Sequence, residues 1–234
     1  MNDKQASSQD RFENGYFWQL YRDLESQFQN FLEYVPYFEG NEKVYSFRLL
    51  NLVLCIGGHV DSALKEMARY PRFAGNKECM RIYELIKSGK TVPISLLLQV
   101  FDREYRICNA KVIFKRLPEG EQLQPFQPCN SRTLSPKWWK VYNALKHDVA
   151  ISIKSANLQN TLNALAGAFL LNVRHKPAAL MLYDIGFLRI SWPEKLRGKP
   201  AREEVLREQV EEMLEKNSPL LVETPLFLYL YGMD

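Results

Sequence analysis

The chain has 234 residues, of which 46% are hydrophobic, 25% charged and 12% aromatic. This composition excludes an intrinsically disordered chain and a fibrous repeat, and it predicts a well-packed core in a single domain over residues 1–234. The formal charge of +4, with a pI near 8.8, permits a nucleic-acid partner without requiring one.

The four cysteines, Cys55, Cys79, Cys108 and Cys129, show no spacing typical of a zinc site. We therefore expect no metal and reduced thiols in a cytoplasmic protein. The first fifteen residues lack the apolar segment of a signal peptide, and the apolar runs are interrupted before they could span a bilayer. The sequence thus predicts no membrane partner, and it contains no motif for a cofactor.

Two long amphipathic helices are predicted first. Between residues 12 and 35, apolar side chains recur every three or four positions, and Pro36 ends the helix. A second helix covers residues 46–67, with Ser46 as a good N-cap. The pair Gly57 and Gly58 within it predicts either a bend or the close approach of another backbone.

Shorter elements are predicted next. Residues 77–89 form an amphipathic helix that Gly89 ends, and another apolar run follows Pro93. Between residues 108 and 128, β-branched and aromatic residues surround a Pro-Glu-Gly turn. This pattern predicts a small irregular β-hairpin inserted between helices.

The second half of the chain is predicted to be helical again. Ser135 as cap and Pro136 at the first helical position predict a helix that extends through His147. Residues 156–173 predict a further helix, in which a strip of small side chains lets a neighbouring helix come close.

The last part of the chain carries weaker patterns. Pro177 is expected to end the preceding helix, a connector follows as far as Lys199, and residues 202–217 predict a highly charged helix with a solvated face. The apolar C-terminal segment PLFLYLYG is expected to pack back onto the body. The predicted fold is therefore mainly α, a helical bundle with a small β-hairpin-like insertion at about residues 108–128.

A cation, an amide and a titratable imidazole lie in line on the helix predicted after Ser135. Lys140, Asn143 and His147 project from roughly one face. Such a set suits an RNA phosphate: Lys140 neutralises an oxygen, Asn143 orients the backbone or a 2′-hydroxyl, and His147 moves a proton. The alternative is an ordinary solvated helix face.

The same helix offers further nucleic-acid contacts at Lys137, Trp138 and Lys146. Trp138 and Trp139 point about 100° apart on a helix, so they cannot lie on the same face. One is expected in the core. The other either packs at an interface or offers a platform on which a base stacks.

The segment SPKWWKVYNALKHDV, followed by ANLQNTLNALAGAFLL, resembles the HEPN superfamily over residues 135–173. The resemblance implies a compact helical bundle that dimerises, and many members are metal-independent ribonucleases of toxin, antiphage and RNA-processing systems. Their signature is an Arg followed, after four to six residues, by a His. Here His147 matches the histidine and Asn143 the polar interior, whereas Lys140 stands at the position of the arginine.

Two functions follow as hypotheses. The first is an RNA-associated protein of a defence or stress system, a metal-independent endoribonuclease working as a homodimer with Lys140, Asn143 and His147 at its groove. Lysine keeps the charge of arginine but lacks its planar fork. The second hypothesis is therefore a noncatalytic helical module that uses the same helix to bind a second copy or a protein partner.

Two other histidines have simpler interpretations. Cys55 and His59 are one helical turn apart, but with no second pair nearby they predict a buried thiol and a hydrogen-bonded imidazole. His175 lies at a predicted helix C-terminus, where positive charge interacts favourably with the helix dipole.

Overall fold

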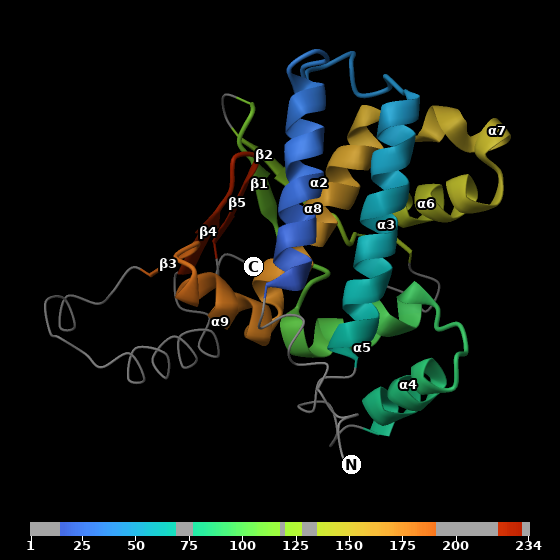
Figure 1. Cartoon of the computed structure of the whole chain (residues 1–234), viewed down its shortest axis with the longest axis vertical. Helices are drawn as coiled ribbons and strands as arrows, with labels where there is room; N and C mark the ends of the chain where they lie inside the picture. The colour runs from blue at the N-terminus through green and yellow to red at the C-terminus, as the bar shows by residue number, and fades with distance from the viewer. Residues whose placement is uncertain (1–14, 69–76, 118–119, 128–134, 191–219, 231–234) are drawn as a thin grey trace, which may run out of the picture.

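The computed structural model describes residues 15–68, 77–117, 120–127, 135–190 and 220–230, and this part is mostly helical with one small sheet (Figure 1). The mainly α fold predicted from the sequence is confirmed. The helices are α2 (Tyr16–Leu32), α3 (Phe47–Met67), α4 (Lys77–Lys87), α5 (Ile94–Tyr105), α6 (Lys137–His147), α7 (Val149–Ser152), the 3-10 turn η2 (Ile153–Ser155), α8 (Leu158–Arg174) and α9 (Lys176–Asp184). The strands are β1 (Val112–Phe114), β2 (Glu121–Leu123), β3 (Leu188–Ile190), β4 (Leu220–Glu223) and β5 (Phe227–Leu230).

Helix α8 lies at the centre of the helical part and is buried on almost every side. Helices α2, α3, α6 and α9 and strand β5 all contact it. Asn157 caps its N-terminus by accepting a hydrogen bond from the Asn160 amide at 2.9 Å. A Cβ on Gly167 would lie 3.0 Å from the Trp138 ring of α6. The predicted strip of small residues is therefore a packing surface.

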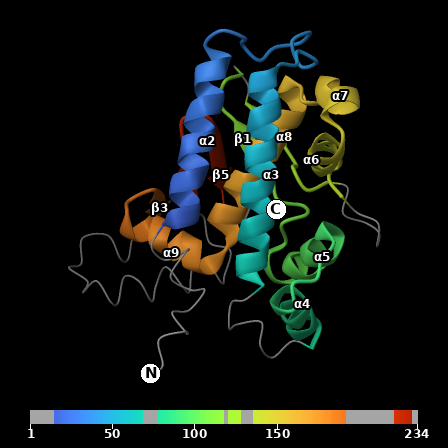
Figure 2. The ribbon, with the colours of Figure 1, turned by 45° about the vertical axis from the view of Figure 1, so that its right-hand side comes forward.

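Helices α2 and α3 lie side by side on one face of α8 (Figures 1 and 2). They bury the apolar faces that their periodicity predicts, with Tyr21, Phe28 and Ile56 fully enclosed. The predicted cap of α3 is confirmed, since the Ser46 hydroxyl accepts a hydrogen bond from the Leu49 amide at 3.2 Å. Local signals in the sequence therefore define both helices.

Helix α3 also has the length and mean hydropathy, 1.3 in its most apolar window, of a helix that could cross a membrane. In the fold, however, 56% of that window is buried inside the protein, against α2 and α8 among other elements. Core packing accounts for its apolar residues.

The predicted hairpin is present but is not a separate insertion. Strands β1 and β2 pair antiparallel with Val112 opposite Leu123, as the turn signal indicates. Strand β1 also pairs with β5, and the five strands form one antiparallel sheet in the order β2-β1-β5-β4-β3. The hairpin therefore forms one edge of a sheet whose other three strands come from the last 50 residues.

The expectation for residues 177–199 was wrong as far as residue 190. Helix α8 does end before Pro177, at Arg174, but Pro177 lies in the first turn of a new helix, α9, where a missing amide hydrogen costs nothing. Helix α9 and strand β3 replace the predicted connector up to Ile190. The C-terminal segment packs onto the body as expected, in the form of β5. The charged helix predicted at residues 202–217 lies outside the described residues.

A buried carboxylate joins helix α2 to the sheet. Glu25 is 1% exposed, and its Oε1 accepts hydrogen bonds from the Leu226 amide, at 3.1 Å, and from the Thr224 hydroxyl. Arg22 donates to Oε2 at 2.5 Å and pairs with its charge. Thr224 and Leu226 lie in the turn between β4 and β5, so this one side chain places the C-terminal hairpin against the helices.

Replacing Gly57 with Ala is expected to destabilise the protein. The added Cβ would lie 2.2 Å from Cδ2 of Tyr142 on α6, an atom too near its own backbone to swing away. Overpacking of this kind costs about 1–3 kcal/mol, more than the gain of up to about 1 kcal/mol from replacing a helical Gly with Ala. Chemical denaturation should show a free energy of unfolding lowered by about 1–2 kcal/mol.

Gly58→Ala is the matched control, because a Cβ at this neighbouring position would meet no atom within 4 Å among the described residues. Its free energy of unfolding should stay the same or rise by up to about 1 kcal/mol. Equal stability of the two variants would contradict the close crossing of α3 and α6 at Gly57.

Candidate nucleic-acid interface

Helix α6 begins one residue later than predicted. Pro136 has an extended backbone and precedes the first helical residue, and its carbonyl accepts hydrogen bonds from the amides of Trp139 and Lys140. The predicted cap at Ser135 is therefore wrong. The helix ends at His147, as predicted, and the Asp148 side chain caps α7 by accepting from the Ile151 amide at 3.1 Å.

Both tryptophans of α6 are buried, which corrects the assignment of Trp138 to nucleic-acid binding. Trp138 is 2% exposed, its ring lies against Phe126, and its indole nitrogen donates to the Pro125 carbonyl at 2.6 Å. Trp139 is 7% exposed and packs on Tyr142 with ring centroids 4.9 Å apart. Neither ring has a free face on which a base could stack. The two rings instead fix α6 to the core.

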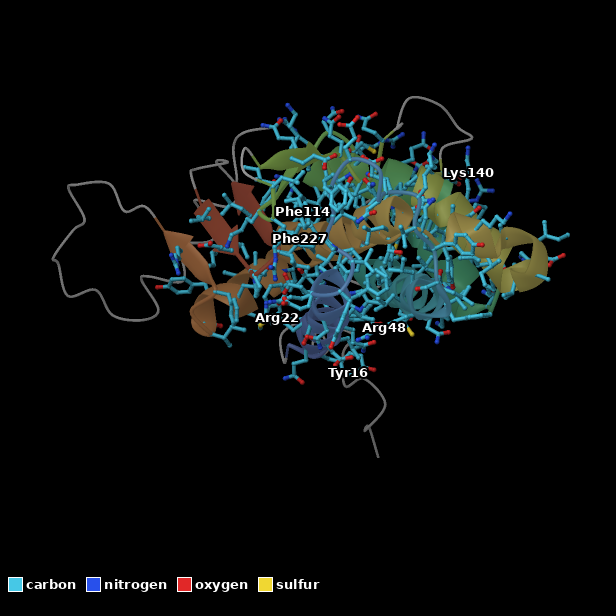
Figure 3. All side chains as sticks on the ribbon, turned by 90° about the horizontal axis from the view of Figure 1, so that it is seen from above. Tyr16, Arg22, Arg48, Phe114, Lys140 and Phe227 are labelled. Atoms are coloured by element: carbon cyan, nitrogen blue, oxygen red, sulfur yellow. The ribbon has the colours of Figure 1, made fainter. Side chains whose placement is uncertain are left out.

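The opposite side of α6 is polar. Lys137, Lys140 and His147 are exposed, and Asn143 is half-buried between them. In Figure 3 Lys140 lies at the edge of the molecule and points away from it. We call these four residues the α6 polar face. His147 lies seven positions after Lys140, which places them about 10 Å apart along the helix.

Lys146 does not belong to this face. Its Nζ lies 5.8 Å from the centroid of the Tyr142 ring, on the flank of α6 that faces α3. Burial, together with the nearby Asp61 carboxylate, raises the pKa of the Tyr142 hydroxyl, so this ring is neutral. A cation over a neutral aromatic ring is a sufficient structural role for Lys146.

The segment from α6 to η2 is strongly basic. Residues 137–155 contain four lysines, Lys137, Lys140, Lys146 and Lys154, against the single carboxylate of Asp148. That carboxylate caps α7. A surface with this excess of positive charge attracts phosphate groups.

No group of three or more His, Cys, Asp or Glu side chains in the described part of the chain could hold a metal ion. Cys55 is exposed, so the expectation of a buried thiol was wrong. Cys108 is disulfide-bonded, which contradicts the expectation that all four thiols are reduced.

Two buried histidines were not recognised as such from the sequence alone. His59 is 6% exposed, and its Nε2 lies 3.4 Å from Nδ2 of Asn172 on α8. His175 is 1% exposed, and its Nδ1 lies 3.0 Å from the Tyr105 hydroxyl. Burial lowers the pKa of His59 to about 4 and that of His175 to about 3. His175 is therefore neutral at pH 7, which corrects the interpretation of it as a positive charge at the end of a helix.

The charge at the end of α8 belongs to Arg174 instead. Its Nε donates to the Tyr105 carbonyl at 2.6 Å and its Nη1 to the Tyr229 hydroxyl at 2.6 Å. This side chain ties α8 to the last carbonyl of α5 and to strand β5.

The sequence also led to no prediction of a cavity that lies between α2 and α3 in the described part of the structure. No residue of α6 lines this cavity. The signal that could have found it is the run of small side chains at Cys55, Gly58 and Ser62, spaced to share one face of α3.

No family model matches the chain, and neither a curated protein nor a solved structure matches it. The resemblance of residues 135–173 to the HEPN superfamily stays a prediction.

Because His59 and His175 are buried in their neutral form, we expect the free energy of unfolding to fall in acid. An unfolded histidine has a pKa near 6.5, so below that pH the unfolded chain binds protons that the folded protein does not. The stability that these groups contribute is fully present above about pH 6.5 and is lost as the pH falls toward about 4, at a slope of about 1.4 kcal/mol per pH unit for each histidine.

Urea denaturation of the parent and of His59→Gln at about pH 7, 6 and 5 measures this effect. In the variant, the free energy of unfolding should depend less steeply on pH, because the contribution of one histidine is absent. The same slope in both proteins would mean that His59 is not buried in its neutral form.

Proposed function

We propose that the protein binds RNA through the α6 polar face. The observation that carries this proposal is the division of α6 into two sides: Trp138 and Trp139 are buried, while Lys137 and Lys140 are exposed one turn apart. A helix held by its apolar side presents the opposite side in a fixed orientation. Two lysines on such a side suit successive phosphates of a flexible strand.

Asn143 and His147 add groups that distinguish RNA from a simple polyanion. The Asn143 amide can both donate to and accept from a 2′-hydroxyl, and the exposed imidazole of His147 can donate to a phosphate or accept a hydroxyl proton. Because both tryptophans are buried, the proposal does not include the stacking of RNA bases on them. Binding by this face therefore depends on the RNA backbone.

RNA cleavage is the catalytic form of this proposal. The proposed HEPN-like bundle would consist of α2, α3 and α8, which pack against one another, and α6, which packs against α3 and α8. In a metal-independent reaction, His147 would take the proton of a 2′-hydroxyl while Lys140 neutralised the phosphate. The 2′-oxygen would form a bond to phosphorus, and the 5′-oxygen would leave and take a proton from water. Because these residues lie about 10 Å apart on one helix, the reaction requires a second copy of the chain, whose Lys140 reaches the phosphate beside the first His147.

A second candidate function is a noncatalytic interaction module. The observation that favours it is Ile151 on α7, which is 83% exposed only four residues after His147, with Val149 39% exposed beside it. Large aliphatic side chains in this setting suit a protein partner better than a nucleic acid. A stable homodimer in sedimentation, with neither RNA binding nor cleavage, would favour this function.

Replacing both Lys137 and Lys140 with Ala is expected to weaken RNA binding and its dependence on salt. Each lysine that neutralises a phosphate of a single strand contributes about 0.7 to the slope of log K against log salt concentration, so the slope should become shallower by about 1.4. Fluorescence anisotropy with a labelled oligouridylate at several salt concentrations measures both quantities.

The matched control replaces Lys87 and Lys90, two exposed lysines at the end of α4 and just beyond it. This double variant has the same net charge as the test variant and should keep most of the affinity of the parent. Equal losses in the two variants would show attraction to the overall charge alone and would contradict an interface on α6.

Cleavage is tested separately, in the presence of EDTA. His147→Ala should lower the rate of RNA cleavage by about a hundredfold or more, the usual contribution of a general acid or base. Lys140→Arg should raise the rate, because the guanidinium binds a phosphate with two parallel hydrogen bonds. If the parent protein cuts RNA no faster than His147→Ala, the proposal of cleavage is refuted. The proposal of RNA binding would then be decided by the anisotropy measurements alone.

A further inference from the structure

A cavity of about 490 Å³ lies between α2 and α3, on a different side of the molecule from the α6 polar face. Tyr16 at its edge and Lys140 on α6 lie on opposite sides in Figure 3. Its volume falls in the range of sites for small organic molecules. Residues 16–27 of α2 and 55–66 of α3 form its walls.

Small side chains on α3 make room for the cavity. Cys55, Gly58 and Ser62 line it at steps of three and four residues, so all three lie on one face of the helix. A Cβ at Gly58 would meet no atom within 4 Å among the described residues. Space beside Gly58 is therefore open, in contrast to the filled space beside Gly57.

A buried imidazole borders this space. His59 lines the cavity and is 6% exposed, and its Nδ1 has no hydrogen-bond partner among the described residues. The ring lies edge-on to Phe17, with centroids 5.7 Å apart, and its other nitrogen faces α8. Buried polar groups without partners are rare in folded proteins. A donor or acceptor in the cavity would supply what His59 lacks.

The charges around the cavity favour a cation. Among the described residues that line it, Asp23 is an exposed carboxylate, Glu66 is buried and Lys65 is the one cation. The Lys65 ammonium is already paired with Asp61 at 2.5 Å, whereas the Asp23 carboxylate receives a neutral hydrogen bond from Gln27 at 2.7 Å. The Asp23 carboxylate therefore contributes negative potential that Lys65, already neutralised by Asp61, does not cancel.

Aromatic side chains indicate the shape of the rest of the ligand. Tyr16 is 50% exposed at the edge of the cavity and Phe17 forms part of its wall, with ring centroids 5.5 Å apart. Flat apolar rings pack well beside such side chains.

We propose that the cavity between α2 and α3 binds a small organic molecule with a flat apolar ring and a positively charged nitrogen. The ring lies over Gly58 between Tyr16 and Leu24, and the cationic nitrogen faces Asp23. A polar atom of the ligand forms a hydrogen bond with His59.

Three probes that share one ring test this site: tryptamine, which is a cation, indole, which is neutral, and indole-3-acetate, an anion. Titrations followed by amide chemical shifts should locate all binding at α2 and α3. Tryptamine should bind about fivefold more tightly than indole-3-acetate, the factor expected of one partly exposed ion pair. An absence of localised shifts with every probe, or equal affinities for the cation and the anion, would overturn the proposal.

Three substitutions connect the binding to the cavity. Gly58→Leu should fill the space and remove binding of all three probes, and Ser62→Leu, at an exposed position on the same wall, should do the same if Gly58→Leu fails to fold. Asp23→Asn should remove the preference for tryptamine and leave indole binding unchanged. Unchanged binding in a folded Gly58→Leu or Ser62→Leu protein would place the probes elsewhere and refute the site.

Discussion

The burial of α8 is the constraint on which the rest of the structure depends. A helix surrounded on nearly every side cannot keep an amphipathic pattern, and α8 accordingly carries apolar or small residues around most of its circumference. Two of its buried polar side chains donate to backbone carbonyls one turn earlier: Thr161 donates to the Asn157 carbonyl at 2.8 Å, and Asn172 donates to the Ala168 carbonyl at 2.9 Å. Each neighbouring element is positioned by the shape of this one helix.

The candidate interface is a consequence of that packing. Helix α6 is held at two points where a glycine on another helix leaves room for one of its rings, Gly167 for Trp138 and Gly57 for Tyr142. These contacts set the rotation of α6 about its axis. Because these rings point inward, Lys137 and Lys140 on the opposite side of the helix are exposed. The same segment is thus both a packed helix and a basic surface.

The sheet shows the opposite kind of dependence. Its strands are three or four residues long and come from three distant parts of the chain. Short strands of this kind are not stable alone. They are held by Glu25 at the turn between β4 and β5, and by Arg174, which reaches Tyr229 in β5 from the end of α8. These two buried charged groups therefore fix the sheet to the helical part, together with apolar contacts such as Phe227 on Phe169, whose ring centroids lie 5.5 Å apart.

The sequence by itself determined the features that depend on neighbours within one helical turn. These are the apolar face of α2, the Ser46 cap of α3, the end of α6 at His147 and the antiparallel pairing of β1 with β2. Only the tertiary structure decided that both tryptophans are buried, that β1 pairs with β5, and that Lys146 lies apart from Lys140. It also decided that His59 borders a cavity. The physical reason is that periodicity and capping act over three or four residues, whereas burial and strand pairing depend on residues that can lie more than about a hundred positions away in the sequence.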